Sequence, residues 1–95
     1  MAIAFAERVL TCVGDEEKKF VVRLAPLEPS GRGEYKCAYQ IVGPGVKINR
    51  AAYGLDAIQA LQCAFVVIGG ELAHIERAEG LRFEFAGGDH GFPRP

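Results

Sequence analysis

Apolar and polar residues alternate through most of the first half of the chain, a pattern typical of strands with one buried face. Residues 3–13 are rich in apolar and β-branched types, and the turn-forming residues 14–17 follow them. Phe20, Val22 and Leu24 then alternate with more polar neighbours. These two segments predict an antiparallel hairpin.

A second hairpin is predicted after a loop. Residues 26–33 hold two prolines and two glycines, which remove ladder donors and free the backbone, so an exposed connection is expected. Every second side chain of 35–42 falls on one apolar face: Tyr35, Cys37, Tyr39 and Ile41. A turn at 43–45 and a short strand at 46–50 complete the predicted hairpin.

The hydrophobic period changes to that of a helix after Gly54. Asp56 occupies an N-cap position, Gln59 resembles the second half of a capping box, and Gly80 is placed to end the helix. The residues of the predicted apolar face are spaced three and four apart: Ile58, Leu61, Phe65, Ile68, Leu72 and Ile75. The glycine pair 69–70 indicates a bend or a neighbour that packs too closely for a side chain.

A last alternation over residues 81–85 predicts one more strand, and residues 87–93 read as turn and loop. A chain of 95 residues has room for one domain. We therefore predict a single α+β domain over residues 1–95. Its mostly antiparallel sheet has about five strands, in the order β-β-β-β-α-β, with one long helix packed on one face.

Charge and composition narrow the range of partners. With a net charge of −1, the chain has no field that would draw it to nucleic acid or anionic lipid, so neither is an expected partner. The N-terminus lacks the basic start and long apolar core of a signal peptide, and the longest apolar run, 63–70, is too short to span a bilayer. The three cysteines, Cys12, Cys37 and Cys63, form no disulfide framework. A cytoplasmic location is expected.

The residue types that bind metals or act as nucleophiles show no functional spacing. His74 and His90 form no paired motif with each other or with a cysteine, so no metal or cofactor is expected and both histidines are placed at the surface or a helix end. Cys37 and Cys63 lie on predicted apolar elements, and Cys37 is expected to be buried and unreactive.

Four residues remain as candidates for a ligand site. Arg50 ends a predicted strand before the helix, with Tyr53 close by, and would meet an acidic group there. Asp89 and His90 follow the last strand and are expected to approach the same edge of the sheet. The alternative is a surface salt bridge and a solvated turn.

A second stripe follows the side of the predicted helix opposite the first. Its members are small and nearly uncharged, whereas a solvated face normally carries Lys, Glu and Arg: Ala60, Cys63, Val67, Gly70 and His74. A helix is about 10 Å across and strands lie about 4.8 Å apart, so one helix leaves part of a five-stranded sheet open. Both features predict a homodimer, or contact with another protein, through this stripe.

Three segments of the chain resemble one uncharacterised bacterial family of small single-domain proteins, a domain of unknown function. They are CAYQI at 37–41, AYGLDAIQAL at 52–61 and GFP at 91–93. The resemblance covers about residues 5–93 and implies that the chain is a complete natural unit. It implies no activity, cofactor or catalytic residue.

The patterns favour a small non-enzymatic interaction module that self-associates. The alternative is a small-molecule-binding or enzymatic subunit that uses Arg50, Asp89 and His90. An immunity-type protein is a third hypothesis, which rests on analogy of size. The sequence does not separate the three.

Overall fold

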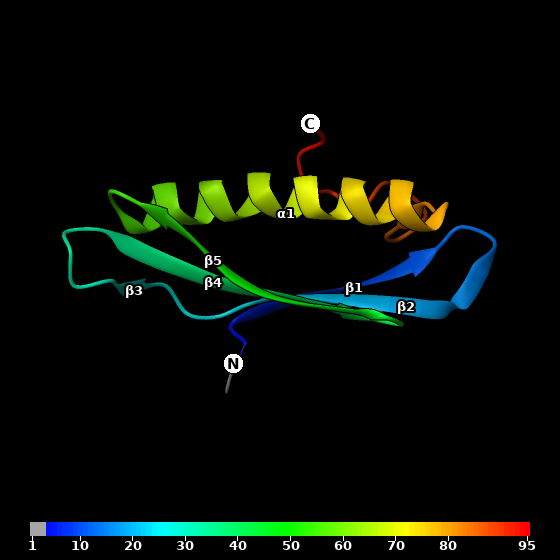
Figure 1. The fold of residues 1–95 in the computed structure, drawn as a ribbon, viewed down its shortest axis with the longest axis horizontal. Coiled ribbons are helices and arrows are strands. Elements are labelled where there is room, and N and C mark those ends of the chain that lie inside the picture. The colour runs from blue at the N-terminus through cyan, green and yellow to red at the C-terminus, as the bar shows by residue number, and fades with distance from the viewer. Residues whose placement is uncertain (1–3) are drawn as a thin grey trace.

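Two antiparallel hairpins form the body of the sheet in the computed structural model, which describes residues 4–95 (Figure 1). The first hairpin joins β1 (Ala6–Cys12) to β2 (Asp15–Leu24), and the second joins β4 (Tyr35–Gly43) to β5 (Val46–Gly54). β2 also pairs antiparallel with β4, so the four long strands lie in the order β1, β2, β4, β5. Both predicted hairpins are confirmed, although β5 runs to Gly54 and is therefore longer than the predicted strand at 46–50.

Two short strands complete the sheet. β3 (Glu28–Pro29) pairs with the start of β4, and therefore lies in a segment for which only a loop is predicted. β6 (Phe83–Glu84) pairs with the end of β1 at Thr11 and Cys12. The predicted α+β fold, an antiparallel sheet with one helix, is confirmed with six strands in place of about five.

The single helix, α1 (Ala57–Glu79), lies along one face of the sheet (Figure 1). Asp56 is its N-cap, and the Asp56 Oδ1 atom accepts a hydrogen bond of 2.7 Å from the Gln59 N–H. The Gln59 Oε1 atom accepts from the Leu55 N–H at 2.6 Å, one residue before the position of a standard capping box. Gly80 ends the helix with a left-handed backbone, as predicted.

One core fills the space between α1 and the sheet. The alternation predicted for β2 and β4 is confirmed, because all of the following are buried: Phe20, Val22, Leu24, Cys37, Tyr39 and Ile41. The helix contributes small residues as well as large ones: Ala60, Ala64, Ile68, Leu72 and Ile75. The predicted apolar face of the helix is wrong at Ile58, which is 70% exposed in the first turn. Alanines face the sheet there, and a Cβ atom at Gly54 would collide with the backbone of Ala60, so helix and strand touch closely.

The two adjacent glycines of α1 serve different purposes. A Cβ atom at Gly69 would collide with the carbonyl oxygen of Pro93. The C-terminal tail, residues 89–95, therefore crosses the helix at a point that leaves no room for a side chain. A Cβ atom at Gly70 would meet nothing within 4 Å. Of the two predicted explanations, close packing therefore holds for Gly69.

The face of the sheet away from α1 carries a row of polar side chains in register across four strands. Glu7, Arg23, Gln40 and Asn49 lie directly opposite one another in β1, β2, β4 and β5. Arg23 Nε donates to Glu7 Oε2 at 2.9 Å, Arg23 Nη1 to Gln40 Oε1 at 3.3 Å, and Gln40 Nε2 to Asn49 Oδ1 at 3.0 Å. This outer face is thus adapted to water along its middle.

Candidate functional site

The four predicted ligand residues do not form one site. Arg50 and Tyr53 belong to β5, whereas Asp89 and His90 follow β6. The prediction that Arg50 ends a strand is wrong, because β5 continues to Gly54 and Arg50 lies within it. The prediction that both pairs approach the same edge is wrong, because β6 pairs with β1 and β5 with β4, at opposite edges of the sheet. The four residues therefore do not lie together, as one shared ligand site would require.

Arg50 binds an acidic residue of the helix. Its Nη1 atom donates to the two carboxylate oxygens of Glu71 at 2.9 and 3.0 Å, and the hydroxyl of Tyr39 donates to Glu71 Oε2 at 3.0 Å. Burial, reinforced by this hydrogen bond to Glu71, raises the pKa of Tyr39 to about 12. The Arg50 side chain is 64% exposed, so the pair is the surface salt bridge of the alternative interpretation, and it ties β5 to α1. Tyr53 is 49% exposed beside it.

Asp89 belongs to an ionic cluster that fixes the C-terminal tail. Arg94 Nη2 donates to Asp89 Oδ1 at 2.6 Å, and Arg94 Nη1 donates to Glu76 Oε1 at 2.8 Å. The hydrogen bond from Arg94 is the main reason why the pKa of Asp89 falls to about 2. Burial raises the pKa of Glu76, but hydrogen bonds from Arg94 and from the Phe83 N–H bring it below its ordinary value. Arg94 therefore links the tail to α1 through hydrogen-bonded ion pairs.

His90 is fully buried, which corrects the prediction of a surface histidine. Its Nδ1 atom accepts a hydrogen bond of 3.0 Å from the Phe92 N–H, so the neutral ring carries its proton on Nε2. The Nε2 atom has no hydrogen-bond partner within residues 4–95. Burial lowers the pKa of His90, and the nearby Asp89 carboxylate opposes that effect only in part. The tail packs around this ring through Phe92, so His90 is a buried structural residue that anchors the tail.

We expect the free energy of unfolding to decrease as the pH falls from 7.5 to 5.5, and a His90→Gln variant to lose most of that decrease. The folded state holds His90 neutral at a pH where the unfolded chain, with an ordinary pKa near 6.5, takes up a proton. Stability is therefore present above the unfolded pKa and is lost as the pH falls towards the folded pKa. Denaturant titrations at several pH values measure the effect.

The exposed His74 provides the matched control for this experiment. A His74→Gln variant should keep the full pH dependence of the wild type. Protonation of Asp89 and of Glu76 falls below the tested range, because both pKa values are lowered from acidic starting values. Equal slopes for the wild type and His90→Gln would contradict the assignment.

The three cysteines differ in their exposure. Cys37 is completely buried, as predicted, and burial raises the pKa of its thiol. Burial also raises the pKa of Cys12, while Cys63 is partly exposed on α1. All three are free thiols. Among residues 4–95, no three side chains of His, Cys, Asp or Glu gather as a metal site would require.

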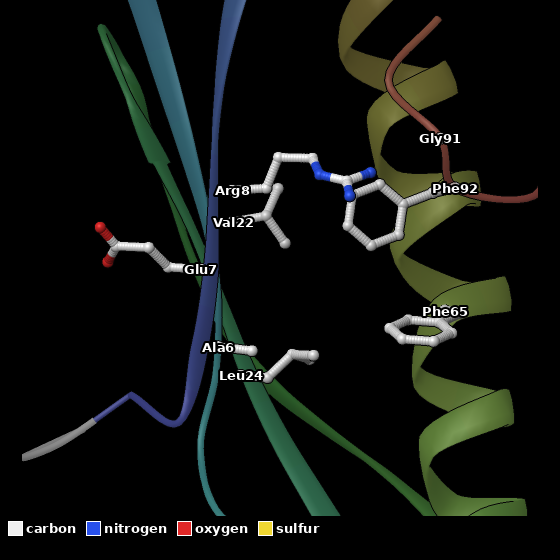
Figure 2. A pocket seen from close by; sticks show the side chains of 8 residues that line it. All are labelled: Ala6, Glu7, Arg8, Val22, Leu24, Phe65, Gly91 and Phe92. Atoms are coloured by element: carbon white, nitrogen blue, oxygen red, sulfur yellow. The ribbon is translucent and has the colours of Figure 1, made fainter. Parts of the chain in front are cut away.

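A pocket of about 270 Å³ opens between β1 and α1 (Figure 2). Ala6, Val22 and Leu24 extend from the sheet towards it, and Phe65 faces them from the helix. Glu7 contributes its backbone only, since its side chain points to the other side of β1. The walls are thus mostly apolar.

Arg8 supplies the charged side chain of this pocket, and sequence reasoning missed it. Its guanidinium lies over the ring of Phe85 at 4.2 Å from the centroid and 5.6 Å from that of Phe92, and Nη1 donates to the His90 carbonyl oxygen at 2.9 Å. The signal was present: Arg8 occupies an inward position of β1, between the inward residues Ala6 and Leu10.

The helix back, defined here as Cys63, Val66, Val67, Gly70 and His74, is the second candidate surface. Val66 is 60% exposed and Val67 41% exposed. Ala60, which the sequence placed on this stripe, is fully buried against the sheet and is therefore no part of it. The apolar run at 63–70 is too short to span a bilayer, but α1 as a whole is long and apolar enough to cross a membrane, a property that it shares with many core helices of soluble proteins.

Together these features define a two-layer α+β domain with a small cationic pocket and an apolar helix back. Comparison with protein-family models identifies the family. The chain belongs to the family described as Domain of unknown function (DUF6968), which matches residues 6–94. No curated protein and no solved structure matches the chain.

Proposed function

We propose that the protein is a non-enzymatic interaction module that self-associates in the cytoplasm through the helix back. The observation that carries this proposal is the exposure of Val66 and Val67 on a face without charged residues between Asp56 and Glu71. Such a face is unusual for a helix in contact with water. The three free thiols fit a reducing compartment.

The charges at the two ends of the helix favour a second copy as the partner. When two α1 helices pack antiparallel about a two-fold axis between Val66 and Val67, Asp56 of each copy faces Arg77 of the other. The same register places Cys63 opposite Gly70, so small residues flank the crossing point and the backbones approach closely. In this register opposite charges of α1 meet at both ends, which favours this isologous contact.

The size of the contact predicts moderate affinity. From Asp56 to Arg77 the helix is about 32 Å long, because each residue adds about 1.5 Å. A contact made mainly by one helix from each copy lies at the small end of specific interfaces. We therefore expect a dissociation constant of about 10–100 µM for the dimer.

We expect Val67→Glu to abolish the dimer without unfolding the protein, because two carboxylates would enter the apolar centre of the contact. Sedimentation equilibrium at protein concentrations from about 5 to about 500 µM covers the dissociation constant expected for an interface of this size. Val9→Glu is the matched control: it makes the same change at a valine of similar exposure, 43%, on the outer face of the sheet. A wild type that stays monomeric throughout, or a dimer that only Val9→Glu dissociates, would overturn the proposal.

A further inference from the structure

We infer that the pocket around Arg8 binds a small amphipathic carboxylate, an apolar group that ends in one carboxylate. The inference does not depend on self-association, since the pocket and the helix back share no residue. It rests on the position of Arg8, on the lack of an ion pair at its guanidinium among residues 4–95, and on the shape of the pocket.

Arg8 is held in place by an aromatic ring and a backbone carbonyl group. The ring of Phe85 and the carbonyl oxygen of His90 fix the guanidinium, and a Cβ atom at Gly91 would collide with its Nη1 atom. Gly91 has a φ of +90°, a backbone conformation that favours glycine, so the tail is built to leave room for this side chain. Within residues 4–95, Arg8 forms no ion pair and uses one of its five N–H groups in a side-chain hydrogen bond.

The surroundings of Arg8 favour an anion over a cation or a neutral molecule. The one acidic residue among those that line the pocket, Glu7, turns its side chain to the opposite face of β1 (Figure 2). There its carboxylate accepts a hydrogen bond from Arg23. A guanidinium beside aromatic rings is poorly hydrated and matches the two oxygens of a carboxylate. The unused donors of Arg8 thus select a carboxylate.

The rest of the pocket selects an apolar body of limited size. Arg8 and Phe92 lie together at one end, whereas Ala6, Leu24 and Phe65 lie at the other (Figure 2). The pocket therefore has a cationic end and an apolar end. Its volume of about 270 Å³ is just below the usual range for drug-sized ligands, which begins at about 300 Å³. A short hydrocarbon chain or a single aromatic ring suits this space.

Three probes separate the two parts of the ligand. Hexanoate carries both the apolar chain and the carboxylate, 1-hexanol carries the chain without a carboxylate, and acetate carries the carboxylate without the chain. We expect hexanoate to bind with a dissociation constant of about 1 mM, as fits so small a ligand, and the other two to bind at least tenfold more weakly. NMR titration measures binding through the amide of Gly91 and the ring signals of Phe65 and Phe92. Absence of hexanoate binding, or equal binding of 1-hexanol, would overturn the assignment.

Two variants locate the site. Arg8→Gln should weaken hexanoate binding at least tenfold, whereas Arg32→Gln, at an exposed arginine of the loop before β4, should leave it unchanged. Ala6→Leu fills the apolar end without touching Arg8 and should also weaken binding at least tenfold, which keeps the test open if Arg8→Gln fails to fold. Unchanged affinity in Ala6→Leu would contradict the site. A peptide with a free C-terminal leucine that binds tenfold tighter than hexanoate would overturn the small-molecule assignment in favour of chain termini.

Discussion

Replacing Gly69 by alanine should lower the free energy of unfolding by about 1–3 kcal/mol, the usual cost of overpacking. Replacing Gly70 by alanine should raise it by about 0.5–1 kcal/mol, because alanine is the better helix former. Two identical substitutions at adjacent residues of α1 are thus expected to have opposite signs. Denaturant unfolding of both variants measures the difference.

The reason lies in what each added methyl group would meet. At Gly69 the methyl group collides with the carbonyl oxygen of Pro93, which is backbone and cannot rotate away. The tail must then move, and this weakens the hydrogen bonds of Arg94 to Glu76 and Asp89. At Gly70 the methyl group enters open space.

A second measurement separates tail displacement from other causes of destabilisation. The Phe92 N–H donates to His90 Nδ1, so its hydrogen exchange reports on the tail. Exchange at Phe92 should accelerate in Gly69→Ala and stay unchanged in Gly70→Ala. Because Gly70 belongs to the helix back, both variants should be compared at low micromolar concentration, where the proposed dimer is dissociated. Effects of the same sign in the two variants would contradict the packing described here.

The sequence predicts the individual elements of this fold well, because each depends on local periodicity. The alternation around Phe20 and around Cys37 determines which side of β2 and β4 is buried, and Asp56 and Gly80 mark the two ends of α1. These signals arise from side-chain spacing and from backbone capping, which need no knowledge of distant residues.

The candidate site could not be predicted in the same way, because it depends on which strands become neighbours. The pairing of β6 with β1 separates His90 from Arg50 and brings the tail beside Arg8, a partner 82 positions away in the chain. Nothing in the local pattern of residues 83–90 specifies β1 as the neighbour of β6. The inward position of Arg8 was readable from the alternation in β1, but its partners were not.

The largest loss of stability is expected for Phe20→Ala, at about 3–5 kcal/mol, as for other buried phenylalanines. Phe20 is fully buried, and its ring packs edge-on against the buried Phe83 with centroids 4.9 Å apart. This contact links β2 to β6, whose strand pairing within residues 4–95 is limited to Thr11 and Cys12 of β1. Loss of the ring therefore leaves a cavity where the C-terminal part of the chain joins the sheet.

Gly43 makes this prediction specific through a double-mutant cycle. A Cβ atom at Gly43 would collide with the Phe20 ring, so Gly43→Ala alone should lower the free energy of unfolding by about 1–3 kcal/mol. Without such a collision alanine is normally the more stable residue in a strand, because glycine loses more backbone freedom on folding. In the Phe20→Ala background the ring is gone and the new methyl group enters the cavity. The second substitution should then cost nothing or stabilise the protein, which gives a coupling energy of about 1–3 kcal/mol. The Gly70→Ala variant is a suitable parent for the cycle, because its added stability keeps Phe20→Ala folded. Additive effects of the two substitutions would show that the ring does not occupy the space beside Gly43.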